Sequence, residues 1–233
     1  WQSPYYVHLY GKVKYPHYRA ETFFPHLQIE LELPENWKIY AVTAETAEGS
    51  KYRYVPDNLN PECVRYFIEL THEKYKRHLG DKFGGVIPGI FTDETATGAP
   101  FAWTPRFSDE FEKRRGFAIE GSYHCIFKGN SPENRELREA YWKTVQELFI
   151  EAFFTPVNEW CKSNGLQLCG HGIGEEDPLA TTGGMNIFAL QNYVGIPGFD
   201  HITPNIPDGH SFKSLNLGGK LVSSAAEQNG EHR

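Results

Sequence analysis

The sequence lacks several features that identify common classes of function. It has 23 Lys and Arg against 30 Asp and Glu, which gives a formal net charge of −7. A nucleic-acid-binding surface normally needs an excess of basic residues. No apolar run in the sequence approaches the roughly 20 residues of a membrane-spanning helix. We therefore expect neither a nucleic-acid partner nor a membrane span.

Cysteine and glycine motifs are also missing. The four cysteines form no C-x-x-C pair and no zinc-binding spacing, so we expect buried free thiols. The glycines do not form the G-x-G-x-x-G loop of dinucleotide-binding proteins. There is no G-x-S-x-G nucleophile motif, and acyl-transfer chemistry has little support. We expect no cofactor, although the acidic composition leaves a calcium ion open.

Aromatic residues are plentiful, at 15% of the 233 residues. Aromatic faces stack on sugar rings, but large loop-rich enzymes have the same composition. The sequence opens on Trp1 without a Met, and it stops at Arg233 without a closing element. We interpret both ends as cuts within a longer protein. A complete (β/α)8 barrel needs about 250 residues, so this chain would hold an incomplete one.

The order of the expected elements indicates an α/β fold. Residues 1–56 are irregular, with strands expected at 27–33 and 37–42. From residue 57 onward, helices alternate with short apolar strands, as in a parallel sheet. The strands are expected at 86–92, 166–171 and 197–202, and the helices at 60–79, 107–115, 132–164, 185–193 and 220–229. Asn60 and Pro61 suit the start of the first helix, Ser108 or Thr104 could cap the second, and Gly165 would end the third. The sequence therefore predicts an irregular, β-containing segment (1–56) followed by part of a (β/α) TIM barrel (57–233).

Glu94 is the best candidate for a catalytic acid. It follows the apolar run Val86–Thr92 directly after Asp93, and barrel active sites lie at the C-terminal ends of the strands. Glycoside hydrolysis needs one carboxylic acid to protonate the leaving oxygen and a second carboxylate as nucleophile or base. A glutamate at the end of a buried strand is held rigidly and partly desolvated, which suits the proton donor. Asp93 would orient Glu94 or bind substrate, unless both residues simply begin a solvated loop.

The next two strand ends carry further candidates for substrate binding. His171 ends the strand 166–171 and Glu175 follows it in a glycine-rich segment, while Asp200 and His201 fall in the strand 197–202. Trp103, in the loop after Glu94, could stack on a sugar ring or simply pack on the barrel rim. His171 and His201 could also serve a metal-dependent hydrolase, but no H-E-x-x-H spacing supports a metal site.

Several of these motifs, taken together and in order, resemble one group of enzymes. They are Asn60-Pro61-Glu62, Thr71-His72-Glu73-Lys74-Tyr75, Gly89-Ile90-Phe91-Thr92-Asp93-Glu94, Trp103-Thr104-Pro105, Gly170-His171 with Glu175, and Pro197-Gly198-Phe199-Asp200. The chain from about residue 57 resembles large bacterial glycoside hydrolases of the α-L-rhamnosidase-like and β-galactosidase-related group.

The resemblance implies a catalytic (β/α)8 barrel that acts on plant or host polysaccharides, outside the cell or in the periplasm. It implies that Glu94 is the general acid at the end of the fourth strand. The partner carboxylate of such barrels lies near the seventh strand, so we expect it beyond Arg233 and expect this segment alone to be inactive. A non-catalytic carbohydrate-binding barrel remains the alternative reading.

Overall fold

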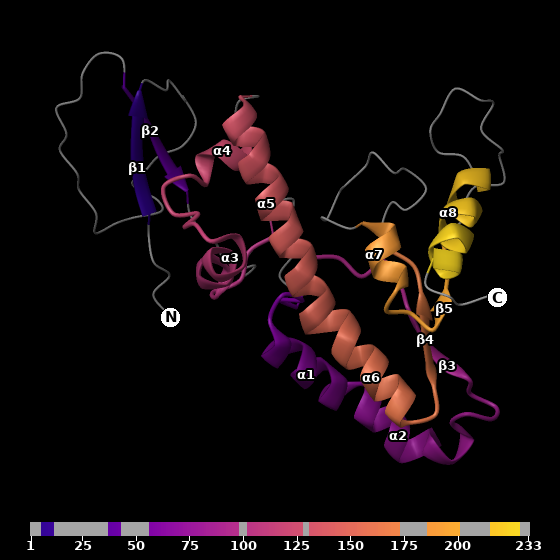
Figure 1. Ribbon diagram of the computed structural model, residues 1–233. Helices are drawn as coiled ribbons and strands as arrows, with labels where there is room; N and C mark the ends of the chain where they lie inside the picture. Colours follow the sequence, from indigo (N-terminus) through magenta and orange to yellow (C-terminus); the bar gives the residue numbers. More distant parts are fainter. Residues whose placement is uncertain are drawn as a thin grey trace.

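The computed structural model describes residues 6–11, 37–42, 56–97, 102–127, 131–172, 186–200 and 215–228 (Figure 1). Strands β1 (Tyr6–Gly11) and β2 (Trp37–Val42) form an antiparallel pair. The strand expected at 37–42 is therefore confirmed as β2. The strand expected at 27–33 lies outside the described residues, so the partner found for β2 is β1, which the sequence pattern did not indicate.

The segment after residue 60 folds as two consecutive helices rather than one. Helix α1 (Pro61–Leu70) begins as expected, because the Asn60 side chain accepts a hydrogen bond from the Glu62 amide and Pro61 occupies the first turn. Helix α2 (His72–Leu79) follows after Thr71, and the short 3₁₀ turn η2 (Gly80–Lys82) ends the segment. Thr71 donates its hydroxyl hydrogen to the Phe67 carbonyl, which supports the break between the helices.

Helix α3 (Phe107–Arg115) has the expected bounds but not the expected cap. Neither Ser108 nor Thr104 caps it with a side chain; the Phe107 amide donates instead to the Thr104 backbone carbonyl at 2.9 Å. The Thr104 hydroxyl is engaged elsewhere, because it donates to Asp57. The short helix α4 (His124–Phe127) follows.

The longest feature is a nearly continuous helix that runs along the molecule (Figure 1). It consists of α5 (Pro132–Phe149), the π-helical turn η3 (Ile150–Phe154) and α6 (Thr155–Ser163). Gly165, with a φ of 71°, follows its end, as the sequence indicated. The π turn was not expected from the sequence. It contributes Phe153 and Phe154 to the core, and Phe153 stacks on Phe67 of α1.

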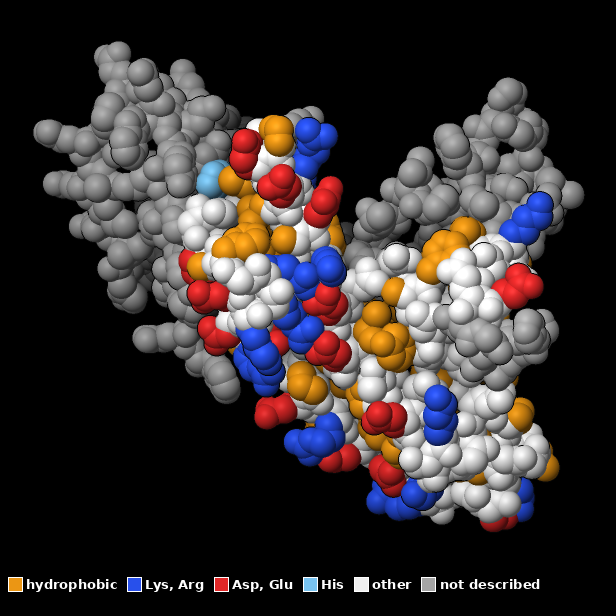
Figure 2. Space-filling view, in the orientation of Figure 1, with side chains coloured by type: hydrophobic (Ala, Val, Ile, Leu, Met, Phe, Trp, Pro, Cys, Tyr) orange, Lys and Arg blue, Asp and Glu red, His pale blue; other side chains and the backbone are white. Residues whose placement is uncertain are grey.

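The hydrophobic core lies between this long helix and its neighbours. Helix α1 contacts η3 and α6, and α3 contacts α5. The largest fully buried apolar side chains are Phe107, Phe111, Phe149, Phe154, Ile119 and Leu168. Where α3 meets the long helix, Arg114 bonds to Glu110 and to Glu151, and Arg115 bonds to Glu147. Figure 2 shows basic and acidic side chains interspersed on the face that it views.

Three short strands form a parallel sheet in the order β3-β4-β5. They are β3 (Gly89–Thr92), β4 (Gln167–Gly170) and β5 (Ile196–Pro197). Helix α7 (Ile187–Gln191) connects β4 to β5, and α8 (Leu215–Gln228) follows β5 and contacts it. The predicted alternation of strands and helices is therefore confirmed for these elements.

The eight-stranded barrel stays a prediction, because the described ranges contain three parallel strands. Between residues 56 and 228, more of the described residues lie in helices than in strands. No helix in the described part of the chain is long and apolar enough to cross a membrane.

Candidate active site

The register of the parallel sheet brings three strand ends to one edge. Thr92 at the end of β3 pairs with Gly170 of β4, and Gly170 pairs with Pro197 of β5. Asp93 and Glu94 follow β3, His171 follows β4, and Asp200 follows β5 across Gly198-Phe199. Ionisable side chains from segments more than a hundred residues apart in sequence are thus carried to the same edge of the sheet, as the strand pattern predicted.

Glu94 has an unusual backbone conformation at this edge. Its φ is 40°, and it is the one non-glycine residue with a positive φ in the described part of the chain. An L-residue in this region is strained by about 1–3 kcal/mol, and such strain is concentrated at functional sites. A hydrogen bond between the Thr92 and Thr95 hydroxyls, 2.5 Å long, closes the turn around Glu94. We call residues 92–97 the Glu94 turn.

The expectation that Glu94 is partly desolvated is not met. The side chain is exposed, because β3 ends at Thr92 and the chain has turned outward before Glu94 is reached. Asp93 is exposed as well, with 76% of its side-chain surface accessible. Both carboxylates are therefore open to a ligand at the surface of the described structure.

Asp93 is paired with His171, which joins the ends of β3 and β4. Asp93 Oδ1 lies 2.9 Å from His171 Nε2, and His171 Nδ1 lies 2.8 Å from the Gly172 carbonyl oxygen. Which ring nitrogen donates in these two contacts depends on the tautomer of the imidazole. The His171 side chain is 6% exposed, so the exposed Asp93 carboxylate is tied to a side chain buried in the fold.

Glycine at position 170 makes this approach of the strands feasible. Gly170 has a φ of 144°, and a Cβ placed on it would lie 2.1 Å from the Thr92 carbonyl oxygen. The next amide, that of His171, faces the same Thr92 oxygen at 3.4 Å. A side chain at position 170 would therefore push apart the two strand ends that carry Asp93 and His171.

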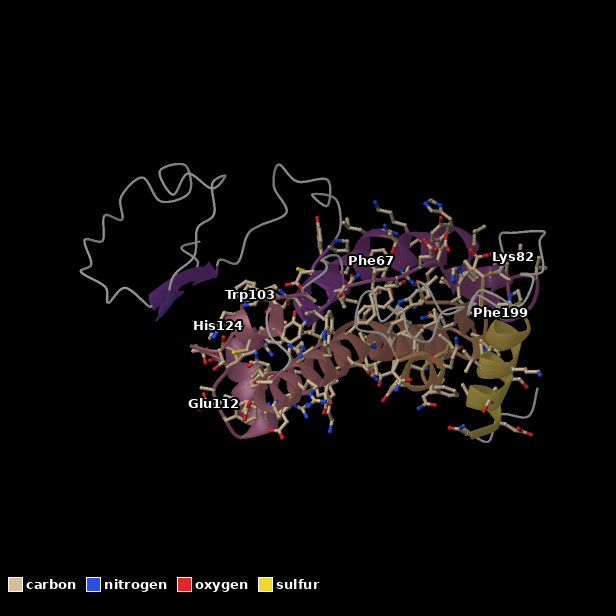
Figure 3. All side chains as sticks on the ribbon, turned by 90° about the horizontal axis from the view of Figure 1, so that it is seen from above. Phe67, Lys82, Trp103, Glu112, His124 and Phe199 are labelled. Carbon is tan, nitrogen blue, oxygen red and sulfur yellow. The ribbon has the colours of Figure 1, made fainter. Side chains whose placement is uncertain are left out.

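Trp103 is not brought to this edge with the other candidates. It is half-buried and packs against the hydrophobic core. Figure 3 shows Trp103 and Phe199 far apart, at opposite ends of the labelled side chains, and Asp200 directly follows Phe199. The packing role that the sequence left open for Trp103 fits this position better than a sugar platform beside Asp200.

Two of the expected site residues, Glu175 and His201, lie outside the described residues. Asp200 is half-buried. Phe199 beside it rests on α8, because a Cβ added at Gly218 would lie 2.8 Å from its ring. Within the described ranges, no three His, Cys, Asp or Glu side chains are grouped so that they could hold a metal ion. A metal site that includes His201 stays a prediction.

Sequence reasoning missed two residues that contact the segments around the Glu94 turn. Asn58 is 5% exposed and donates from Nδ2 to the Ala96 carbonyl at 2.7 Å. Asp57 accepts a hydrogen bond from Thr104 at 2.8 Å and another from the Leu59 amide at 3.1 Å. Burial raises the pKa of the Asp57 carboxyl, and the bonds from Thr104 and Leu59 oppose that rise. In the sequence, an Asp-Asn pair before a helix indicates only a turn or a cap.

Comparison with known proteins identifies a fold but no family. No family model matches the chain, and no curated protein matches it. Among solved structures, the chain is similar to a rhamnosidase from Novosphingobium sp. PP1Y, with a TM-score of 0.59 and 21% sequence identity over 87% of this chain. The match covers 18% of that rhamnosidase. The likeness shows a rhamnosidase-like fold over most of the chain, in agreement with the resemblance found in the motifs.

Proposed function

We propose that this chain belongs to the catalytic domain of a glycoside hydrolase that cleaves O-glycosidic bonds in a plant or host polysaccharide. The observation that carries the proposal is the strained, exposed Glu94 at the end of β3, beside the ends of β4 and β5. The rhamnosidase-like fold supports the same class of reaction. Deoxyhexosides such as α-L-rhamnosides are accordingly the first substrates to test.

In this proposal Glu94 is the general acid. It gives its proton to the leaving oxygen while the bond between that oxygen and the anomeric carbon breaks, and water adds to the sugar. An acid in this role must reach an oxygen on a polymeric substrate, which its exposed position allows. The second carboxylate comes from a later strand of the proposed barrel. Its distance from Glu94 decides the stereochemistry: about 5 Å for retention and roughly 6.5–9.5 Å for inversion.

The neighbouring side chains bind the sugar. Asp93 accepts hydrogen bonds from hydroxyl groups, and His171 fixes its orientation through the 2.9 Å contact. Asp200 lies after the adjacent strand and serves a second hydroxyl. Glu175 and His201, expected beside them in the sequence, complete the proposed sugar site. Trp103 is left out of it because of its packing in the core.

The test is the hydrolysis of a panel of chromogenic glycosides by wild type, Glu94→Gln and Glu112→Gln. The protein assayed is the full-length product of the gene. Glu112 is an exposed glutamate on α3, so Glu112→Gln makes the same chemical change away from the candidate site and serves as the control. We expect Glu94→Gln to lose on the order of 10² or more in rate, the contribution of a general acid. Glu112→Gln should keep the wild-type rate.

The remaining outcomes separate the alternatives. Full activity in Glu94→Gln would show that Glu94 is not the general acid. If chelation then abolished the activity, a metal-dependent hydrolase that uses His171 and His201 would replace the proposal. Sugar binding by the wild type without any turnover across the panel would instead indicate a carbohydrate-binding barrel without catalysis.

A further inference from the structure

Asp57 and Asn58, which precede α1 by a few residues, contact the segments on both sides of residues 98–101. Asn58 donates to the carbonyl of Ala96, 38 residues away, and Asp57 accepts from the hydroxyl of Thr104, 47 residues away. Asn58 and Thr104 are 5% and 4% exposed. One dipeptide therefore contacts the end of the Glu94 turn and the start of the chain that leads into α3.

A turn of this kind requires support from outside itself. Glu94 has a left-handed φ of 40°, which an L-residue keeps only when its surroundings determine it. Inside the turn, the Thr92–Thr95 hydroxyl bond is one restraint. Asn58 supplies another from a different part of the chain. Because Asn58 is buried, water does not readily replace this bond, and losing it leaves a polar group unsatisfied.

We propose that the Asp57-Asn58 pair is a positioning element for Glu94, with Asn58 fixing the turn through Ala96 and Asp57 fixing the following segment through Thr104. Neither residue is a catalytic residue, because each acts through the backbone that carries the acid. The inference rests on the proposed function, in which Glu94 protonates the leaving group. The buried Asp57 carboxyl belongs to the same element, with hydrogen bonds to both its oxygens.

Asn58→Asp is the sharpest test, because it preserves shape and replaces the Nδ2 donor by an oxygen. Two acceptors would then face each other at the 2.7 Å contact with Ala96, and the turn would be released. Asn60→Asp is the matched control two residues away. Asn60 caps α1 through its side-chain oxygen, and aspartate caps equally well. Thr104→Val removes the Asp57 contact, while Thr104→Ser keeps the hydroxyl and should rescue it.

The assay compares substrates with poor and good leaving groups. A displaced acid slows the cleavage of a poor leaving group, which needs a proton, more than that of a dinitrophenyl glycoside. For Asn58→Asp and Thr104→Val we expect kcat on a poor leaving group to fall about tenfold to hundredfold, with KM within about twofold of wild type. Hydrogen exchange of peptides that cover residues 92–97 should become faster in Asn58→Asp. Asn60→Asp and Thr104→Ser should match wild type.

The outcomes distinguish this inference from the proposed function. If Glu94→Gln is impaired while Asn58→Asp and Thr104→Val keep the wild-type rates, the positioning role is wrong and the acid assignment stands. An equal loss on both leaving groups would also overturn it, because that indicates general damage. If Glu94→Gln is itself unimpaired, both proposals fall. Should Asn58→Asp not fold, Thr104→Val and its serine rescue decide the question.

Discussion

The backbone strain at Glu94 predicts that the protein is more stable with glycine than with alanine at this position, the reverse of the usual order. A left-handed φ costs an L-residue roughly 1–2 kcal/mol, and glycine avoids that cost. Glycine loses more entropy on folding, by roughly 0.5–1 kcal/mol relative to alanine. At a φ of 40°, Glu94→Gly should therefore be more stable than Glu94→Ala by about 0.75 kcal/mol, the difference between the midpoints of these two ranges.

The same pair of substitutions at Glu112 gives the reference. Glu112 lies within α3 and is exposed, and glycine in an exposed helix is about 1 kcal/mol less stable than alanine. The difference in the free energy of unfolding between the Gly and the Ala variant should thus have opposite signs at positions 94 and 112. For a chain of this size 1 kcal/mol shifts Tm by about 2–4 °C, which thermal unfolding resolves.

Four variants measured under one condition complete the experiment. If Gly is less stable than Ala at position 94 by as much as at position 112, Glu94 is not held in the left-handed region. The argument that strain marks the site would then fail. Confirmation would also predict that Glu94→Gly is stable but inactive, which separates the function of the side chain from the stability of the fold.

Two further predictions test the packing around the site and within the core. Gly170→Ala should destabilise the protein by about 1–3 kcal/mol, the usual cost of overpacking, and reduce activity, because its Cβ would meet the Thr92 oxygen. Gly116→Ala is the control, since Gly116 also has a positive φ but no atom lies within 4 Å of its Cβ position; equal losses of Tm would contradict the close approach. Burial lowers the pKa of His72, so its folded pKa lies below the unfolded value of about 6.5. The neutral His72 side chain therefore contributes to stability above a pH of about 6.5, and this contribution is lost as the pH falls below the unfolded pKa. The Tm of His72→Leu should accordingly fall less between pH 7 and pH 5 than the Tm of wild type. Equal slopes in a series of thermal melts would contradict this.

The hydrogen bonds of His72 explain why acid should destabilise it. The Thr71 hydroxyl hydrogen is given to the Phe67 carbonyl, so the 2.7 Å contact between Thr71 and His72 requires a hydrogen on His72 Nδ1. His72 Nε2 then carries a lone pair. It is buried and has no hydrogen-bond partner among the described residues. Protonation would place a second N–H where no acceptor is available.

Local signals in the sequence predicted the local structure well. Asn60 and Pro61 marked the start of α1, Pro132 marked the start of α5, and Gly165 marked the end of the long helix. These residues act through their own backbone and its nearest neighbours, so the sequence alone reveals them. The end of β3 was also found at Thr92, and that of β4 within one residue, because each apolar run stops where polar residues begin. The strand expected at 197–202 is wrong in extent, since β5 already ends at Pro197.

Features that depend on distant contacts were not predictable in the same way. Asn58 is recognised as part of the candidate site only when Ala96, far along the chain, is brought to it. Thr104 was expected to cap α3, but Asp57 takes its hydroxyl. The left-handed backbone of Glu94 has no signal in the sequence either, since glutamate is not a residue that favours it. In each case the tertiary structure decides between roles that the local sequence permits equally.

Glu94 is exposed, whereas His171 and Asn58, which contact the segment around it, are buried. In the proposed function Glu94 has to reach an oxygen of its substrate, and an exposed residue on an ordinary loop is free to move. Here the orientation is set below the surface, by His171 on Asp93 and by Asn58 on Ala96. The side chains of His171 and Asn58 are buried, whereas the Asp93 carboxylate that His171 contacts is exposed. The exposed segment that carries Glu94 is thereby connected to two buried side chains, which is what the proposed positioning of a general acid needs.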